Sequence, residues 1–253
     1  MATGEIPTRA VLGIPIVCLE LREISNTVIN LITEPGKKTF FYVNGHCLNI
    51  ANRDPVYRKI LQGADLVYAD GMGPILASKI LGRPLLERTP TPDFIGKVFT
   101  VAIKKKWSIY LLGGEGEVVK KAQENLQKRF KRLQIAGYHH GFFKKNEQII
   151  KQINRAGADI ILVGMGTPRQ EKWIAQNKNK VNAKAFWAVG ALFEIFSNKR
   201  KRAPKWMQQI GLEWTFRLIQ DPKRLWRRYL LGNITFLLTV FGERAVFFRK
   251  SSH

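Results

Sequence analysis

Short apolar runs alternate with amphipathic stretches along most of the chain. The runs that predict strands lie at residues 39–43, 64–69, 107–112, 134–138, 159–163 and 185–189. The stretches between them carry helix signals: Asp54-Pro55 and Thr91-Pro92 are typical helix starts, and Gly63, Gly82 and Gly157 are typical ends. Strands that alternate with helices predict a parallel sheet with right-handed crossovers. We therefore expect an α/β, Rossmann-like fold with a mostly parallel sheet flanked by helices.

The run at residues 64–69 leads directly to a carboxylate, Asp70, and a glycine turn that opens a helix. In open α/β sheets, ligands bind in the crevice at the carboxyl ends of the strands. Asn44 ends the preceding strand and Arg88 follows one helix later, so both should converge on that crevice. An ionised carboxylate there can accept a proton from an attacking hydroxyl. Asp70 is therefore a candidate catalytic base, with simple capping of the next helix as the alternative.

A second turn follows the run at residues 159–163 and carries two glycines, Gly164 and Gly166. Thr167 and Gln170 fit a capping box, and Pro168 fits the first helical position. A helix start of this kind directs free N–H groups at the mouth of the sheet, which suits a phosphate. Stabilisation of the helix end alone is the alternative. The glycine spacing is not the dinucleotide fingerprint, which disfavours a nicotinamide-dependent oxidoreductase.

The composition bounds the class of protein. With 253 residues, 45% of them hydrophobic, the chain can bury a large core. Cys18 and Cys47 form no CxxC pair, which favours a reducing compartment, the cytoplasm. We find no secretory signal, and the apolar run at residues 229–241 is too short and polar to span a bilayer of ~30 Å. No Asp-x-Asp pair or zinc spacing of histidines occurs, so we expect neither a metal nor a cofactor.

The net charge of +23 predicts an anionic partner. Residues 199–253 hold 13 Lys/Arg and 3 Asp/Glu, interleaved with Trp and Phe, a mixture typical of a segment at a membrane surface. A solvated basic face is the alternative. The shift in composition near Ser197 predicts two parts: an α/β core at residues 1–197, and a basic, aromatic-rich helical appendage at residues 198–253.

The appendage also supplies arginines with helical spacing. Arg224, Arg227 and Arg228 share one face of a predicted helix, and Arg217 lies at the end of the helix predicted over residues 206–220. Such a cluster suits bidentate phosphate recognition, although scattered surface charge would also explain it. A basic protein could instead bind nucleic acid. The chain has no helix-turn-helix, zinc or RNP signature, so we expect no nucleic-acid partner.

Three blocks in a fixed order resemble one family. They are Pro-Arg-Gln-Glu-Lys-Trp at residues 168–173, Arg-Ala-Pro-Lys-Trp at residues 202–206 and Gly-Leu-Glu-Trp at residues 211–214. With the strand that ends at Asp70 and the segment at residues 138–143, they resemble the WecG/TagA/CpsF glycosyltransferases, glycosyltransferase family 26. The resemblance covers about residues 11–241. That family makes lipid-linked precursors of bacterial cell-surface polymers.

The resemblance implies an inverting, metal-independent transfer of a sugar from a UDP-sugar to a sugar on a polyprenyl diphosphate. It implies that Asp70 is the base and that the appendage closes over the site at the inner face of the cytoplasmic membrane. Association with a second copy stays open. Arg88 joins Asp70 as a candidate catalytic residue, and the candidate substrate-binding residues are Tyr42, Asn44, Gly164, Gly166, Gln170, Glu194, Arg217, Arg224 and Arg228.

Three positions depart from the family pattern. Tyr42 stands where Thr is common, Thr91-Pro92-Asp93 where Gly-x-Asp is frequent, and Glu194 where Asp is usual. Tyr42 and Thr91 match positions that hold a substrate. The sugar is therefore left open between an N-acetylmannosamine type and another hexose.

Overall fold

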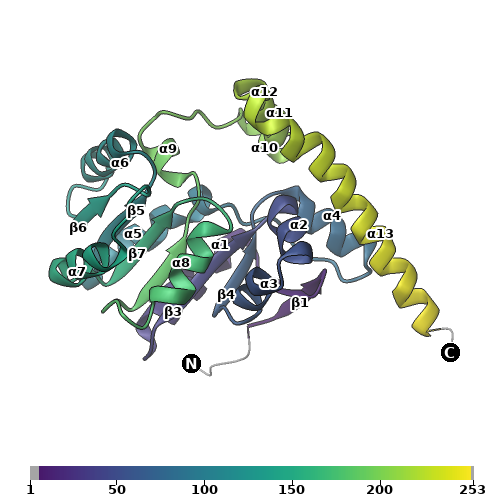
Figure 1. Cartoon of the computed structure of the whole chain (residues 1–253), viewed down its shortest axis with the longest axis horizontal. Helices are drawn as coiled ribbons and strands as arrows, with labels where there is room; N and C mark the ends of the chain where they lie inside the picture. The colour runs from purple at the N-terminus through teal and green to yellow at the C-terminus, as the bar shows by residue number, and fades with distance from the viewer. Residues whose placement is uncertain (1–5, 252–253) are drawn as a thin grey trace.

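The computed structural model describes residues 6–251, and a six-stranded sheet with the order β4-β3-β8-β7-β5-β6 forms the centre of that part of the chain. All neighbouring strands of this sheet pair in parallel. The strands are β3 (Lys38–Val43), β4 (Leu66–Ala69), β5 (Ser108–Gly113), β6 (Gln134–His139), β7 (Ile160–Gly164) and β8 (Ala185–Ala188). Helices flank the sheet (Figure 1), which confirms the predicted α/β, Rossmann-like fold.

Two hydrophobic cores lie on opposite faces of the sheet, because successive side chains of a strand point to opposite sides. Phe41 and Val43 of β3 enter one core, and Phe40 enters the other. The first core is covered by α2 (Gly45–Arg53), α3 (Pro55–Gln62), α4 (Met72–Ile80), α7 (Asn146–Ala156) and α8 (Arg169–Asn177). The second is covered by α1 (Leu21–Thr33), α5 (Thr91–Lys105), α6 (Gly116–Arg129) and α9 (Leu192–Phe196).

A hairpin precedes the sheet, in a region where the hydrophobic pattern predicted no element. Its strands are β1 (Thr8–Val11) and β2 (Ile14–Val17), which pair antiparallel. Leu12 and Gly13 form the turn with φ of 51° and 75°, the conformation that a two-residue hairpin turn requires. The apolar run at residues 10–19 is thus part of the packed core.

The segment after residue 204 folds into several helices. These are α10 (Lys205–Gln209), α11 (Glu213–Gln220), α12 (Pro222–Trp226), the π-helical turn η1 (Arg227–Leu231) and α13 (Gly232–Ser251). The single helix predicted over residues 206–220 is therefore wrong. The chain breaks at Gly211, whose φ is +79° and where a Cβ would lie 2.5 Å from Cγ of Met72. Glycine allows both the left-handed turn and this close approach to α4.

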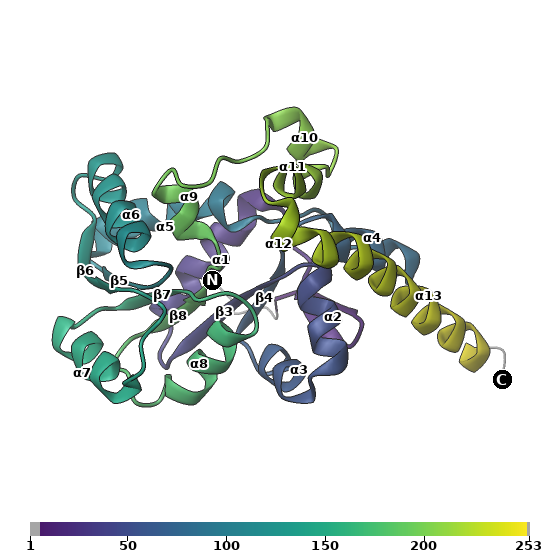
Figure 2. The same ribbon diagram turned by 45° about the horizontal axis from the view of Figure 1, so that its top comes forward.

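Helix α13 packs along α2 and α4 and then extends away from the sheet (Figures 1 and 2). Phe236 and Val240 are buried in the first core, and a Cβ on Gly45 would lie 3.6 Å from the Phe236 ring. Nδ2 of Asn49 donates a hydrogen bond of 2.7 Å to the carbonyl of Gly232. Burial of a phenylalanine contributes about 1.5–3 kcal/mol, so α13 is anchored at its first half. No helix of the described residues is both long and apolar enough to cross a membrane.

Candidate functional site

A cleft of about 520 Å³ opens at the carboxyl ends of β3, β7 and β8. This is the edge of an α/β sheet where ligands bind. The core supplies one wall, with Tyr42, Asn44, Asp70 and Thr91 among the lining residues. The appendage supplies the opposite wall through Arg200, Arg217, Arg224, Leu225, Arg228 and Tyr229. Helices α11 and α12 accordingly lie together beyond the sheet (Figure 2).

Glycines form the floor of the cleft. Gly164 and Gly190 line it, and a Cβ on Gly164 would lie 2.8 Å from the Gly190 carbonyl oxygen. Gly190 has φ of +54°, and a Cβ there would lie 2.4 Å from the Tyr42 hydroxyl. The surrounding protein therefore leaves no room for a side chain at either glycine. Gly166 lines the same wall as Gly164, as the sequence predicted for both.

The start of α8 differs from the prediction. Pro168 occupies the N-cap position without a capping hydrogen bond, so the predicted capping box is wrong. The Thr167 hydroxyl instead donates to Oε1 of Glu171 at 2.9 Å and lines the cleft. Gln170 is fully buried and does not line the cleft; its Oε1 accepts from the Gly190 N–H at 3.1 Å. Gln170 therefore supports the turn at Gly190 from behind the wall.

Glu171 is a buried acid that the sequence did not single out. Burial raises its pKa to about 7, while hydrogen bonds from Gln170 and Thr167 oppose that rise. Its Oε2 has no hydrogen-bond partner among the described residues, and neither does the buried Tyr57 hydroxyl. The neighbouring arginine, glutamine and lysine made this position resemble a solvated helix face. Only its spacing of four residues from Thr167 indicates the inward direction.

Asp70 projects its carboxylate into the cleft, where no described side chain hydrogen-bonds to it. The N-cap of α4 is Gly71 and lacks a side-chain cap, so the alternative that Asp70 caps this helix is excluded. Burial raises the pKa of Asp70 above its usual range, against the opposing charge of Arg217. Asn44 does cap its helix, because its Oδ1 accepts from the N–H groups of His46 and Cys47 at 3.1 and 3.2 Å. Its side chain also lines the cleft.

The appendage arginines converge as predicted, with one exception. Arg217, Arg224 and Arg228 line the cleft, whereas Arg227 lies over the Trp226 ring and does not. The cation–ring distance of Arg227 is 5.3 Å. In the described structure, Nε of Arg228 is buried without a hydrogen-bond partner, which leaves it available to an anion.

Two further charged residues, Arg200 and Glu194, line the cleft. Arg200, which the sequence analysis missed, lines the cleft and contacts Glu194 at 2.6 Å. The signal was weak because Arg200 lies in a basic run that resembles a linker. Beside them, burial and the charge of Arg228 lower the pKa of His46 to about 4, so His46 is neutral at pH 7.

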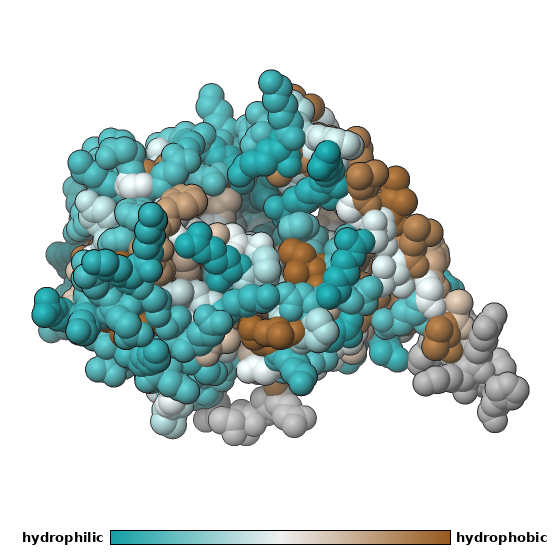
Figure 3. Space-filling view, viewed as in Figure 1, coloured by the Kyte–Doolittle hydropathy of each residue, from teal (hydrophilic) through white to brown (hydrophobic). Residues whose placement is uncertain are grey.

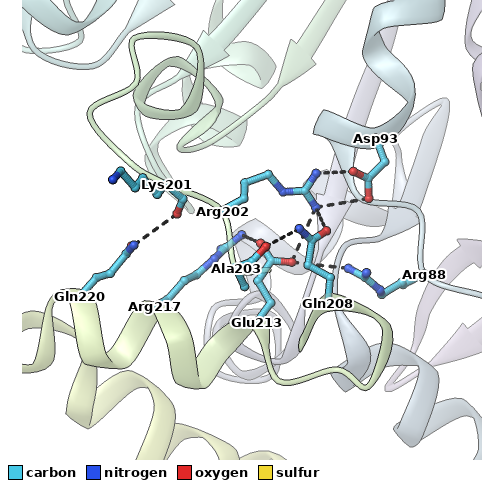
Figure 4. Close-up of polar contacts among 9 residues, drawn as sticks. All are labelled: Arg88, Asp93, Lys201, Arg202, Ala203, Gln208, Glu213, Arg217 and Gln220. Carbon is cyan, nitrogen blue, oxygen red and sulfur yellow. Dashed lines mark hydrogen bonds and ion pairs between the residues drawn. The ribbon is translucent and has the colours of Figure 1, made fainter. Parts of the chain in front are cut away.

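Arg88 lies beside the cleft and does not line it. Its Nη1 is 3.5 Å from Oε2 of Glu213, the first residue of α11. Oε1 of the same carboxylate lies 2.8 Å from Nη2 of Arg217, and Arg202 approaches from the linker between α9 and α10, residues 197–204 (Figure 4). Sequence reasoning placed Arg88 at the crevice but did not identify Glu213 as its partner.

The cleft therefore combines a carboxylate that can accept a proton with a wall of arginines and a floor of backbone. Arginines bind phosphate groups with charge-assisted hydrogen bonds. Within the described residues, no group of three or more His, Cys, Asp or Glu could hold a metal ion. The arrangement suits proton abstraction beside a phosphate-bearing ligand.

Comparison with known proteins is consistent with this chemistry. Residues 9–250 match the model of the Glycosyl transferase WecG/TagA/CpsF family. The chain is 34% identical over 185 residues to proteins of Staphylococcus aureus strains MW2, NCTC 8325 and COL. Each is named N-acetylglucosaminyldiphosphoundecaprenol N-acetyl-beta-D-mannosaminyltransferase, and the match covers 73% of this chain and 72% of each relative. A match of this extent shows that the chain belongs to the WecG/TagA/CpsF family and is a glycosyltransferase of the hexosyltransferase type.

Proposed function

We propose that this enzyme transfers a sugar from a UDP-sugar to a sugar carried on a polyprenyl diphosphate, as a step in cell-surface polysaccharide synthesis. The observation that carries the proposal is the position of Asp70 opposite Arg217, Arg224 and Arg228 across one cleft. The names of the relatives supply the acceptor class, since they act on N-acetylglucosaminyldiphosphoundecaprenol. The sugar that they transfer, N-acetylmannosamine, is one candidate for this chain.

The proposed reaction is a single displacement. Asp70 takes the proton of the acceptor hydroxyl as its oxygen forms a bond to the anomeric carbon. The bond from that carbon to the UDP oxygen breaks on the opposite face, its electron pair leaves with UDP, and the configuration inverts. Arg217, Arg224 and Arg228 stabilise the charge that develops on the diphosphate. Losing one preorganised donor of this kind typically costs ~3 kcal/mol of barrier.

We further infer that arginines supply the positive charge that a divalent cation would otherwise bring to the leaving diphosphate. Arg200 and Arg224 have carboxylate partners, Glu194 and Asp221, at 2.6 and 2.5 Å. Arg228 has no carboxylate within ion-pair distance among the described residues. No neighbouring carboxylate therefore offsets the positive charge of Arg228, and that charge is available to a ligand. Metal independence follows as a testable consequence.

The sugar itself would be selected by Tyr42 and Thr91 in the wall that the core supplies. Tyr42 is half-buried, and its hydroxyl lies 3.4 Å from both the Thr167 hydroxyl and Nε2 of Gln170. The Thr91 hydroxyl contacts that of Tyr68 at 2.6 Å. Both side chains are thus held by the core and present fixed shapes to a bound hexose. We leave the hexose open between an N-acetylmannosamine type and another.

We also propose that residues 198–253 form an appendage that rests on the inner face of the cytoplasmic membrane. Large apolar side chains are exposed along its outer edge, where Figure 3 shows them on α13. They are Trp226, Leu230, Leu231, Ile234, Leu237, Leu238, Phe241 and Val246. An exposed apolar stripe next to basic residues fits the headgroup boundary of an anionic bilayer. This position would bring the cleft to a lipid-linked acceptor.

The reaction is tested by transfer of label from a panel of UDP-sugars to a short polyprenyl diphosphate-linked N-acetylglucosamine, with and without EDTA. We expect turnover with one sugar donor, unchanged by EDTA, and a product whose new linkage is inverted by NMR. Turnover that EDTA abolishes would contradict the role given to the arginines. Failure with every donor would contradict the proposed acceptor.

Membrane association is tested by sedimentation with vesicles of phosphatidylglycerol and phosphatidylcholine. Leu238→Glu places a charge on the apolar stripe, at a side chain that is 68% exposed, and should release the protein from the vesicles. Val56→Glu is the matched control, since Val56 is 61% exposed on α3 and outside the stripe. Equal binding of both variants would refute the proposal. Self-association that Leu238→Glu abolishes without any vesicle binding would assign the stripe to a second copy instead.

A further inference from the structure

Glu213 joins three separate segments through one carboxylate (Figure 4). Arg88 comes from the loop between α4 and α5, Arg202 from the linker, and Arg217 from α11 itself. Oε2 of Glu213 lies 3.5 Å from Nη1 of Arg88 and 3.8 Å from Nη2 of Arg202. Its Oε1 accepts from Nη2 of Arg217 at 2.8 Å. The carboxylate thus connects the core to the appendage.

The three arginines of this cluster differ in the other groups that they contact. Arg202 also pairs with both carboxylate oxygens of Asp93 and donates to Gln208. Arg88 and Arg217 have Glu213 as their ion-pair partner among the described residues. The Glu213 side chain is only 15% exposed, so its removal would leave two guanidinium groups close together in a poorly solvated place. Removing one partner of a poorly solvated ion pair destabilises the fold, because the remaining charge is left uncompensated.

The cluster also faces the candidate base. Arg217, Arg202 and Arg88 each lower the pKa of Asp70, whereas the charge of Glu213 raises it. The charge on Glu213 therefore influences Asp70 both directly and through the arginines whose positions it sets. This connects an appendage residue outside the cleft lining to the reacting group.

We propose that Glu213 is a positioning residue: its carboxylate seats the appendage on the core and fixes Arg88 and Arg217 next to Asp70. The seating depends only on the observed ion pairs. The catalytic consequence rests on the proposed function. The two parts are therefore tested by different measurements.

Seating is tested by limited trypsin digestion, because Lys199 and Lys201 are exposed in the linker. Glu213→Gln removes the charge and keeps the size, and we expect cleavage in the linker to accelerate at least about fivefold, the effect of roughly 1 kcal/mol. Glu213→Asp keeps the charge and should recover part of the protection. Glu147→Gln is the control, since Glu147 is exposed on α7 and pairs with Lys180, not with the linker. A cleavage rate for Glu213→Gln equal to that of the control would overturn the seating role.

The catalytic part is tested by kinetics of the same variants at saturating acceptor. We expect Glu213→Gln to raise KM for the sugar donor about tenfold, because Arg217 loses its fixed position. The acidic limb of the kcat profile should move to higher pH, because Arg217, whose charge lowers the pKa of Asp70 more than the charge of Glu213 raises it, is no longer held beside Asp70. Circular dichroism checks that each variant is folded. A profile unchanged from wild type would overturn the link to Asp70, whereas absence of turnover in wild type would count against the proposed function and leave the digestion result standing.

Discussion

Replacing Asp70 with Asn provides the sharpest test of the proposed chemistry. The amide keeps the size of the carboxylate, and Asp70 neither caps α4 nor hydrogen-bonds to a described side chain. The fold should therefore be kept. General-base catalysis contributes about 10²–10⁴ in rate, which corresponds to about 3–5 kcal/mol of barrier. We expect kcat to fall by that factor.

Binding should respond differently from turnover. The Asp70 carboxylate raises the pKa of Arg217, so its negative charge offsets part of the positive potential of that guanidinium. Without the charge, Arg217 attracts a diphosphate at least as strongly as before. The dissociation constant of UDP, measured by calorimetry, should therefore stay the same or decrease while kcat collapses. A general defect in folding would weaken both.

The pH dependence gives a second measure of the same residue. Burial raises the pKa of Asp70, so the wild-type kcat should fall on the acidic side at a pH above the usual range of an aspartate. The Asn variant should lack this limb. Asp65→Asn is the matched control, because Asp65 precedes the same strand and accepts from the backbone and hydroxyl of Thr39 at 2.8 Å. A kcat for Asp70→Asn within threefold of that control would refute the assignment of Asp70 as the base.

Three further predictions concern the floor, the anchor of α13 and the buried acid. Gly190→Ala should lower affinity for UDP at least tenfold by calorimetry, because its Cβ would displace the Tyr42 hydroxyl; unchanged affinity would show that the floor does not contact the ligand. Phe236→Ala should cost about 3–5 kcal/mol of the packing of α13 and speed hydrogen exchange in that helix, and protection equal to wild type would contradict the anchor. Glu171 has a pKa of about 7 when folded against an ordinary 4.5, so its native form is penalised as pH rises through that window. The free energy of unfolding of Glu171→Gln relative to wild type should therefore rise by up to roughly 3 kcal/mol between pH 4.5 and 7, and a constant difference in urea titrations would contradict the buried acid.

The order of strands and helices over residues 39–189 was predictable because local signals and tertiary packing agree there. The cap at Asp54 shows this, since its Oδ1 accepts from the N–H of Tyr57 at 3.0 Å as the residue pair Asp54-Pro55 indicates. The convergence of Asn44, Asp70 and Arg217 was also predictable. Strand ends and helix faces have fixed directions, which the spacing of residues reveals.

Contacts between distant segments were not predictable in the same way. Thr167 and Gln170 have the spacing of a capping box, yet their side chains bond to Glu171 and Gly190, because burial makes those partners available. The break at Gly211 depends on the approach of α4, from a segment more than a hundred residues earlier. The ion pairs of Glu213 likewise join residues whose local sequences carry no mark of each other.

The glycine floor has a consequence for how this enzyme can change over evolutionary time. Gly164 and Gly190 approach neighbouring atoms too closely for any side chain, so mutation has little freedom there. A ligand held by backbone atoms is recognised by groups that no substitution removes. Tyr42 and Thr91, by contrast, line the cleft with side chains. On the proposed function, new sugar specificities would therefore arise by substitution of Tyr42 and Thr91, with the glycines unchanged and without rebuilding the sheet.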